Sequence, residues 1–104
     1  MKSDRIINKK VVCADGFSMS VQAGEFNYSS PRVDGASRYF SVEIGYPSQR
    51  ESLIIEYAEN PNRPTETVYP WVPSAVISLI CAKHGGIVSG QLPKGIPYLR
   101  ANSS

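Results

Sequence analysis

The length of the chain is the feature that most limits its fold, because 104 residues can supply only one hydrophobic core. Two domains would each fall below the size at which buried apolar surface offsets chain entropy. Hydrophobic residues make up 41% of the chain and charged residues 19%, which is typical of a globular protein. We therefore expect residues 1–104 to form a single folded domain.

Neither membrane insertion nor export is indicated. No apolar run approaches the roughly 20 residues that a membrane-spanning helix needs, and the first residues lead into only a short apolar stretch that contains lysines. Cys13 and Cys81 lie far apart and belong to no disulfide framework, so two free thiols in a reducing compartment are expected. These features predict a cytoplasmic protein with no membrane partner.

The net charge of +2, with acidic and basic residues interspersed, does not form the basic stripe expected of a protein that binds long nucleic acids. A small anionic ligand remains possible, because two or three well-placed arginines are enough to bind one.

The N-terminal part of the chain predicts a β-hairpin. Asp15 and Gly16 separate two strand-like runs, residues 5–14 and 17–23, and an Asp-Gly pair is typical of a tight hairpin turn. A two-residue loop would place Val12 opposite Met19 on the core side and would point Cys13 away from the core.

Further elements follow from periodicity and from the placement of proline. Residues 25–37 predict a long exposed loop, and residues 38–46 alternate as a half-buried strand with Phe40, Val42, Ile44 and Tyr46 on its apolar face. Residues 65–72 predict an edge strand or a strand that stops early, because Pro70 lacks the N–H that a central strand must donate.

Two helices are expected. Ser48 and Glu51 match a capping box at the start of the first, which would end before Pro61. The second would begin at Pro73, bury Val76, Ile77, Ile80 and Cys81, and stop at Gly85.

Residues 87–92 predict a last strand, and residues 93–104 predict an arm that is flexible or becomes ordered at an interface. The expected fold is α+β, with an antiparallel sheet and an N-terminal hairpin packed against two short helices.

The sequence offers little for catalysis. His84 is the only histidine, and a histidine at a helix end usually serves the helix dipole. Cys81 lies one turn earlier but on the expected apolar face, where a thiol is usually inert. One histidine and two distant cysteines match no zinc spacing. We therefore expect no catalytic residues, no metal and no cofactor.

Several side chains in loop-like segments are suited to a planar anion, because arginine binds phosphate and aromatic rings stack on bases. These are Tyr28, Arg32, Arg38, Tyr69, Trp71, Tyr98, Arg100 and Asn102.

Three stretches of the chain, VVCADGFSMSVQAGEFNYSSPR, YFSVEIGYPS and ETVYPWVPSAVISLICAKHGGIVSG, resemble small proteins of tailed phages and prophages. Among these, the best functional match is the anti-Thoeris sponge family, which the chain resembles and which sequesters a cyclic ADP-ribose-type immune signal without cleaving it. The resemblance implies a homo-oligomer with nucleotide pockets between subunits. It implies phosphate binding by Arg32 and Arg100 and base stacking by Trp71 or a nearby aromatic residue. Tyr28, Tyr98 and Asn102 join the site on their chemistry alone.

Two other functions remain open. A protein–protein inhibitor of a host defence complex, such as an anti-CRISPR, would present an exposed patch rather than a pocket. An enzyme would use Cys81 with His84, or an acidic residue of the first helix.

Overall fold

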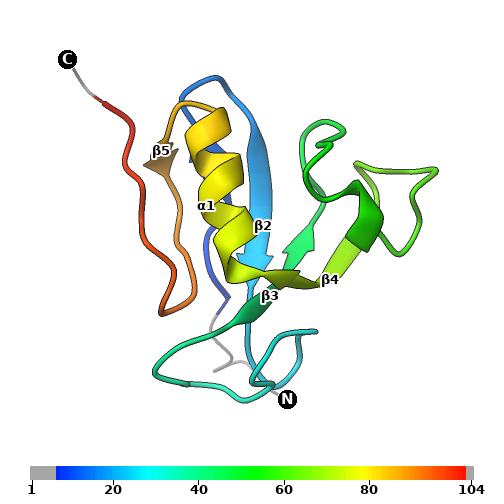
Figure 1. Ribbon diagram of the computed structural model, residues 1–104, viewed down its shortest axis with the longest axis vertical. Helices are drawn as coiled ribbons and strands as arrows, with labels where there is room; N and C mark the ends of the chain where they lie inside the picture. Colours follow the sequence, from blue (N-terminus) through cyan, green and yellow to red (C-terminus); the bar gives the residue numbers. More distant parts are fainter. Residues whose placement is uncertain (1–6, 103–104) are drawn as a thin grey trace.

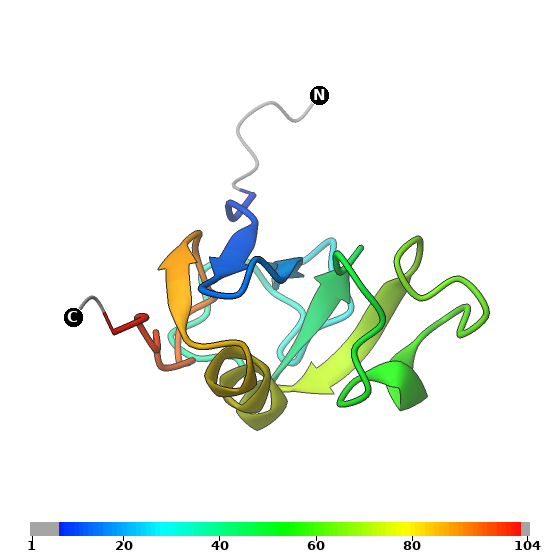
Figure 2. The ribbon, with the colours of Figure 1, turned by 90° about the horizontal axis from the view of Figure 1, so that it is seen from above.

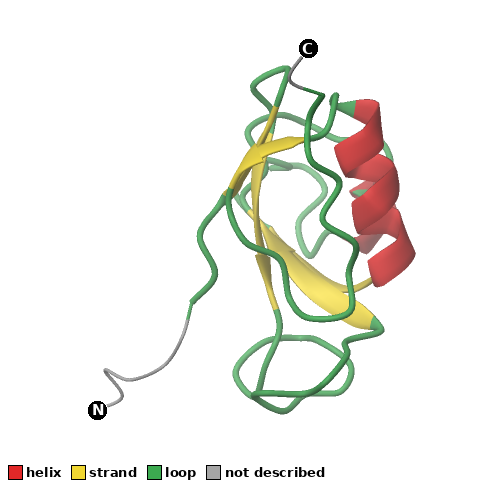
Figure 3. Cartoon of the chain, turned by 90° about the vertical axis from the view of Figure 1, so that its left-hand side faces the viewer, coloured by secondary structure: helices red, strands yellow, loops and turns green. Residues whose placement is uncertain are grey.

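The computed structural model describes residues 7–102, which form a two-layer α+β fold (Figure 1). A five-stranded antiparallel sheet has the strand order β4-β3-β2-β1-β5, and one α-helix covers one of its faces (Figure 3). The expected α+β class is confirmed, but residues 7–102 contain one α-helix where two were predicted. The elements are β1 (Val11–Cys13), β2 (Ser18–Gln22), β3 (Ser41–Gly45), the 3₁₀ helix η1 (Ile55–Tyr57), β4 (Val68–Pro73), α1 (Ser74–Lys83) and β5 (Ile87–Ser89).

The β1–β2 pair shows why the predicted register is wrong. The two strands are antiparallel neighbours, but Val11 lies opposite Met19. The N–H of Cys13 donates to the carbonyl of Phe17, so the loop has three residues and ends at Gly16, whose φ of 95° is left-handed. One additional loop residue reverses the two sides of β1, and Cys13 is therefore buried. Residues 5 and 6 of the predicted strand lie outside the described residues.

β3 and β4 form the other half of the sheet. Val42 and Ile44 are fully buried as predicted, but Phe40 and Tyr46 flank β3 and are each 61% exposed, so the expected apolar face is shorter than predicted. β4 lies at the edge of the sheet, as the position of Pro70 predicts.

The predicted first helix is wrong. Residues 48–60 contain only the short η1, because the two residues of the expected capping box make tertiary contacts instead. The N–H of Ser48 donates to the carbonyl of Ser18, and the Ser48 hydroxyl accepts from the N–H of Ser18. Glu51 is 1% exposed and binds the side chains of Lys83 and His84. Ser48 is therefore held against β2, and Glu51 against the end of α1.

The second predicted helix is present as α1. It begins directly after Pro73, buries Ile77, Ile80 and Cys81, and is followed by Gly85 with a φ of 89°. Val76, which was also expected in the core, is only partly buried.

The C-terminal segment packs along β5, which is shorter than predicted (Figure 2). The N–H of Ile87 donates to the carbonyl of Leu99 at 2.7 Å, and the N–H of Ala101 donates to the carbonyl of Ile87 at 2.9 Å. Ile96 joins the hydrophobic core. Residues 93–102 of the expected arm are thus attached to their own chain, and residues 103 and 104 lie outside the described part.

Candidate ligand-binding site

Trp71 sits at an irregular point of the edge strand β4. Val42 pairs with Val72 and Ile44 pairs with Tyr69, so β4 carries one residue more than β3 across this interval. This bulge contains Trp71, which has a left-handed φ of 50° and an exposed fraction of 51%. A left-handed conformation in a residue with a large side chain is strained, and such residues often occur at ligand sites.

The loop of residues 24–37 brings Tyr28 and Arg32 to Trp71. The N–H of Trp71 donates to the carbonyl of Tyr28 at 3.0 Å, and the two rings lie 4.9 Å apart at an angle of 40°. The guanidinium carbon of Arg32 is 4.9 Å from the centre of the Tyr28 ring, within cation–π range. We call Tyr28, Arg32 and Trp71 the aromatic–arginine cluster.

Glu43 fixes the loop to the sheet. It lies on β3 between the buried Val42 and Ile44, so its side chain points to the sheet face opposite α1. Its carboxylate accepts a hydrogen bond from the Asn27 amide at 3.1 Å and one from the N–H of Tyr28 at 3.5 Å. The cluster therefore combines two aromatic rings and an exposed cation on a supported loop.

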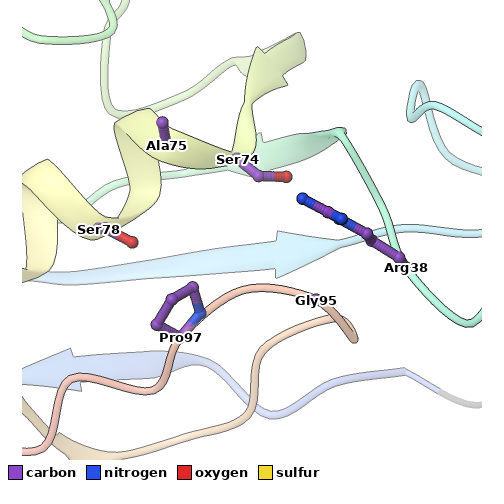
Figure 4. A pocket seen from close by; sticks show the side chains of 6 residues that line it. All are labelled: Arg38, Ser74, Ala75, Ser78, Gly95 and Pro97. Carbon is purple, nitrogen blue, oxygen red and sulfur yellow. The ribbon is translucent and has the colours of Figure 1, made fainter.

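Arg38 belongs to a different surface. Figure 4 shows its side chain extending toward Ser74 across an open hollow of about 360 Å³. The guanidinium also stacks on Phe40, with 5.0 Å between the guanidinium carbon and the ring centre. The hollow is lined by Arg38, Ser74, Ala75, Ser78, Gly95 and Pro97.

The predicted site residues in the C-terminal segment lie apart from the aromatic–arginine cluster. Arg100 pairs with Ile87 of β5, which is the sheet edge opposite β4. Its guanidinium carbon lies 5.3 Å from the centre of the Tyr98 ring, and the Tyr98 hydroxyl donates to the carbonyl of Gly90. Asn102 follows in the same segment. Within one chain, three of the predicted site residues meet and the other three stay near β5.

Tyr69 is part of the core rather than of a ligand site. Its side chain is fully buried, and its hydroxyl donates to the carbonyl of Pro64 at 2.5 Å. Burial also raises the pKa of this phenol.

The sequence analysis missed a charge cluster around His84. Nδ1 of His84 lies 2.6 Å from a carboxylate oxygen of Asp15, and Nε2 lies 2.6 Å from one of Glu51. The second oxygen of Glu51 accepts from the Lys83 ammonium and from the N–H of Leu53, each at 2.8 Å. No sequence signal identifies this group, because Asp15, Glu51 and His84 come from three distant segments.

The pKa values in this cluster favour charged side chains. Burial alone would lower the pKa of His84, but its hydrogen bonds to Glu51 and Asp15 raise it above the usual value. Burial would raise the pKa of Glu51, but Lys83, His84 and the Leu53 N–H together lower it. The N–H of Phe17 and the side chain of His84 lower the pKa of Asp15. The two carboxylates therefore favour the imidazolium form of His84 over the neutral form.

The two thiols are poorly suited to nucleophilic chemistry. Cys13 and Cys81 are both buried and free, and each thiol affects the pKa of the other. Burial raises the pKa of Cys13, and it raises the pKa of Cys81 to about 12. Both nitrogens of His84 already face carboxylates, so neither activates the thiol of Cys81.

A scan against protein-family models, a search of curated proteins and a search of solved structures each gave no match. None of the helices in residues 7–102 has the length and apolar character needed to cross a bilayer. The same part of the chain holds no group of three or more His, Cys, Asp or Glu side chains placed to bind a metal ion.

Proposed function

We propose that this protein is a non-catalytic cytoplasmic binding protein that captures a small anionic ligand with an aromatic base through the aromatic–arginine cluster. The observation that carries the proposal is the convergence of Tyr28 and Arg32 from one loop with Trp71 from β4. The exposed ring of Trp71, beside the partly buried Tyr28, offers a stacking surface, and the exposed guanidinium of Arg32 offers a partner for phosphate. These are the two recognition elements that a nucleotide requires.

The charge cluster supports binding rather than turnover. A general base must reach the reacting proton of a bound substrate, whereas the His84 side chain is only 4% exposed and both its nitrogens contact carboxylates in the structure. A cysteine nucleophile needs a lowered pKa, whereas that of Cys81 is raised to about 12.

The resemblance to phage anti-defence proteins refines the ligand class. We infer a cyclic nucleotide signal of the cyclic ADP-ribose type, held intact by a homo-oligomer. Tyr98, Arg100 and Asn102 lie beside β5, away from the cluster of their own chain. In the proposed oligomer they act on the ligand held by a neighbouring copy.

A thermal-shift assay with a panel of cyclic ADP-ribose isomers and cyclic dinucleotides tests the proposal. At least one of these nucleotides should raise the melting temperature of the wild type, because a ligand that binds only the folded state stabilises it. Heating should release that nucleotide intact. Arg32→Ala and Trp71→Ala should each weaken its binding by about tenfold or more, since stacking on one aromatic ring contributes roughly 1–3 kcal/mol.

Arg63→Ala is the matched control, because Arg63 is exposed and pairs with Glu66 outside the cluster. Arg38→Ala should leave nucleotide binding unchanged, because Arg38 lines the hollow beside α1 and not the cluster. Weaker binding in this variant would place the ligand in the hollow. Arg100→Ala should weaken binding only if the C-terminal segment of a neighbouring copy completes the site. Wild-type affinity in both Arg32→Ala and Trp71→Ala would remove the cluster from the ligand site.

The alternative function is inhibition of a host defence complex through a protein interface. The exposed apolar side chain of Phe40, just before β3, favours it, because Phe40 is 61% exposed and lies with Arg38 on a surface apart from the aromatic–arginine cluster. If no nucleotide shifts the melting temperature while a host protein co-purifies and Phe40→Ala abolishes that association, this function replaces the first.

A further inference from the structure

The charge cluster joins three parts of the fold that are distant in sequence. His84 directly follows α1, Asp15 lies in the β1–β2 turn, and Glu51 lies between β3 and η1. The His84 ring also stacks on Phe17, with 4.2 Å between centroids and 11° between planes. The groups that face the imidazole are thus two carboxylates and one aromatic ring, and Lys83 reaches it only through Glu51.

The two carboxylates differ in their access to water. The side chain of Glu51 is 1% exposed, whereas that of Asp15 is 50% exposed. A neutral imidazole has one N–H and can donate to only one of them. The Glu51 carboxylate loses more without its partner, because it cannot turn to solvent and an unpaired buried charge is costly. The Asp15 carboxylate can exchange the imidazole for water.

We propose that the His84–Asp15 contact is a pH-gated latch between the β1–β2 turn and the end of α1, closed by the imidazolium and opened by the neutral imidazole. Glu51 is the fixed support that holds the ring in both states. The proposal is independent of the ligand and of the proposed function.

The pH at which the latch opens depends on the pKa values of His84 and Asp15. His84 has a raised pKa in the folded protein, so the latch is fully closed below the usual histidine value of about 6.5 and opens as pH rises through the raised value. Asp15 has a lowered pKa, so its carboxylate stays charged throughout the range in which His84 titrates. The opening transition therefore lies on the neutral to alkaline side.

Opening should loosen the turn without unfolding the sheet. Two backbone hydrogen bonds also join the turn to the residues that follow α1: the N–H of Ala14 donates to the carbonyl of Gly86 at 2.9 Å, and the N–H of Asp15 donates to the carbonyl of His84 at 3.2 Å. Once the side-chain contact is lost, these two amides have less protection from exchange. The amide of Val21, in the centre of the β2–β3 pair, serves as the reference because the latch does not touch it.

NMR of the whole chain between pH 6 and pH 9 tests the latch. The imidazole resonances of His84 should titrate above pH 6.5. Protection factors of the Ala14 and Asp15 amides, corrected for intrinsic exchange, should fall about tenfold over the same titration while that of Val21 stays constant. Asp15→Asn should lower the His84 midpoint and give turn amides whose protection no longer depends on pH.

Glu66→Gln is the control for removing a carboxylate, because Glu66 is exposed and pairs only with Arg63 among the described side chains. It should leave the midpoint and the protection factors unchanged. Two results would overturn the latch: turn amides whose protection stays flat while His84 titrates, or a His84 midpoint at or below 6.5. Equal loss at Val21 would also overturn it, because the transition would then be global unfolding.

Discussion

Glu51 is a single residue whose carboxylate is shielded from water and shared among several partners. His84, Lys83 and the N–H of Leu53 all contact it. Negative and positive side chains alternate along the series Asp15, His84, Glu51 and Lys83. Each charge therefore has a partner of opposite sign as long as every member is present. Removing one member of such a buried set usually costs more than the pair contributes, since the remaining charge stays buried without its partner.

Glu51→Gln should therefore lower the free energy of unfolding by roughly 3–5 kcal/mol at pH 7. The amide keeps the size of the side chain but leaves the buried His84 with only one carboxylate, that of the half-exposed Asp15. Urea unfolding followed by circular dichroism measures the change. Glu66→Gln should stay within about 0.5 kcal/mol of the wild type, as expected for an exposed site. Equal stability of the two variants would contradict this account of Glu51.

At the scale of elements, α1 and β4 were predictable because their signals are local. Pro73 and Gly85 mark the ends of α1, and Pro70 excludes β4 from the centre of the sheet. The segment of residues 48–60 was not predictable, because its capping residues bind β2 and His84 instead of their own backbone. The β1–β2 register depended on one loop residue, which an Asp-Gly pair does not specify.

The two faces of α1 give a direct test of its packing. Ile80 is fully buried and Leu79, its neighbour in the chain, is 57% exposed. Ile80→Ala should lower the free energy of unfolding by about 2–5 kcal/mol, because it removes apolar contacts and leaves a cavity. Leu79→Ala should change it by less than about 0.5 kcal/mol. Chemical denaturation of both variants checks the difference, and a reversed order would mean that α1 is rotated about its axis.

At the scale of the whole molecule, the candidate site was predictable only as a set of residue types. Tyr28, Arg32 and Trp71 meet because the loop before β3 crosses to the edge strand. Tyr98 and Arg100 do not join them, because the C-terminal segment follows β5 at the opposite edge. Sequence spacing does not report strand order, so a list of suitable side chains cannot show which of them share a surface.

The charge cluster also predicts how the stability of the whole molecule depends on pH. Asp15 and Glu51 have lowered pKa values, so their contribution is complete above about pH 4.5 and is lost as pH falls through the lowered values. His84 has a raised pKa, so its contribution is complete below about pH 6.5 and is lost as pH rises through the raised value. The free energy of unfolding should therefore be highest between about pH 5 and pH 6.5 and fall on both sides. Urea unfolding from pH 3 to pH 9 measures this profile. In His84→Gln the decline between about pH 6.5 and pH 8 should disappear, because a neutral amide has no proton to lose and the buried thiols contribute only nearer pH 9. An unchanged decline in that range would assign it to other groups.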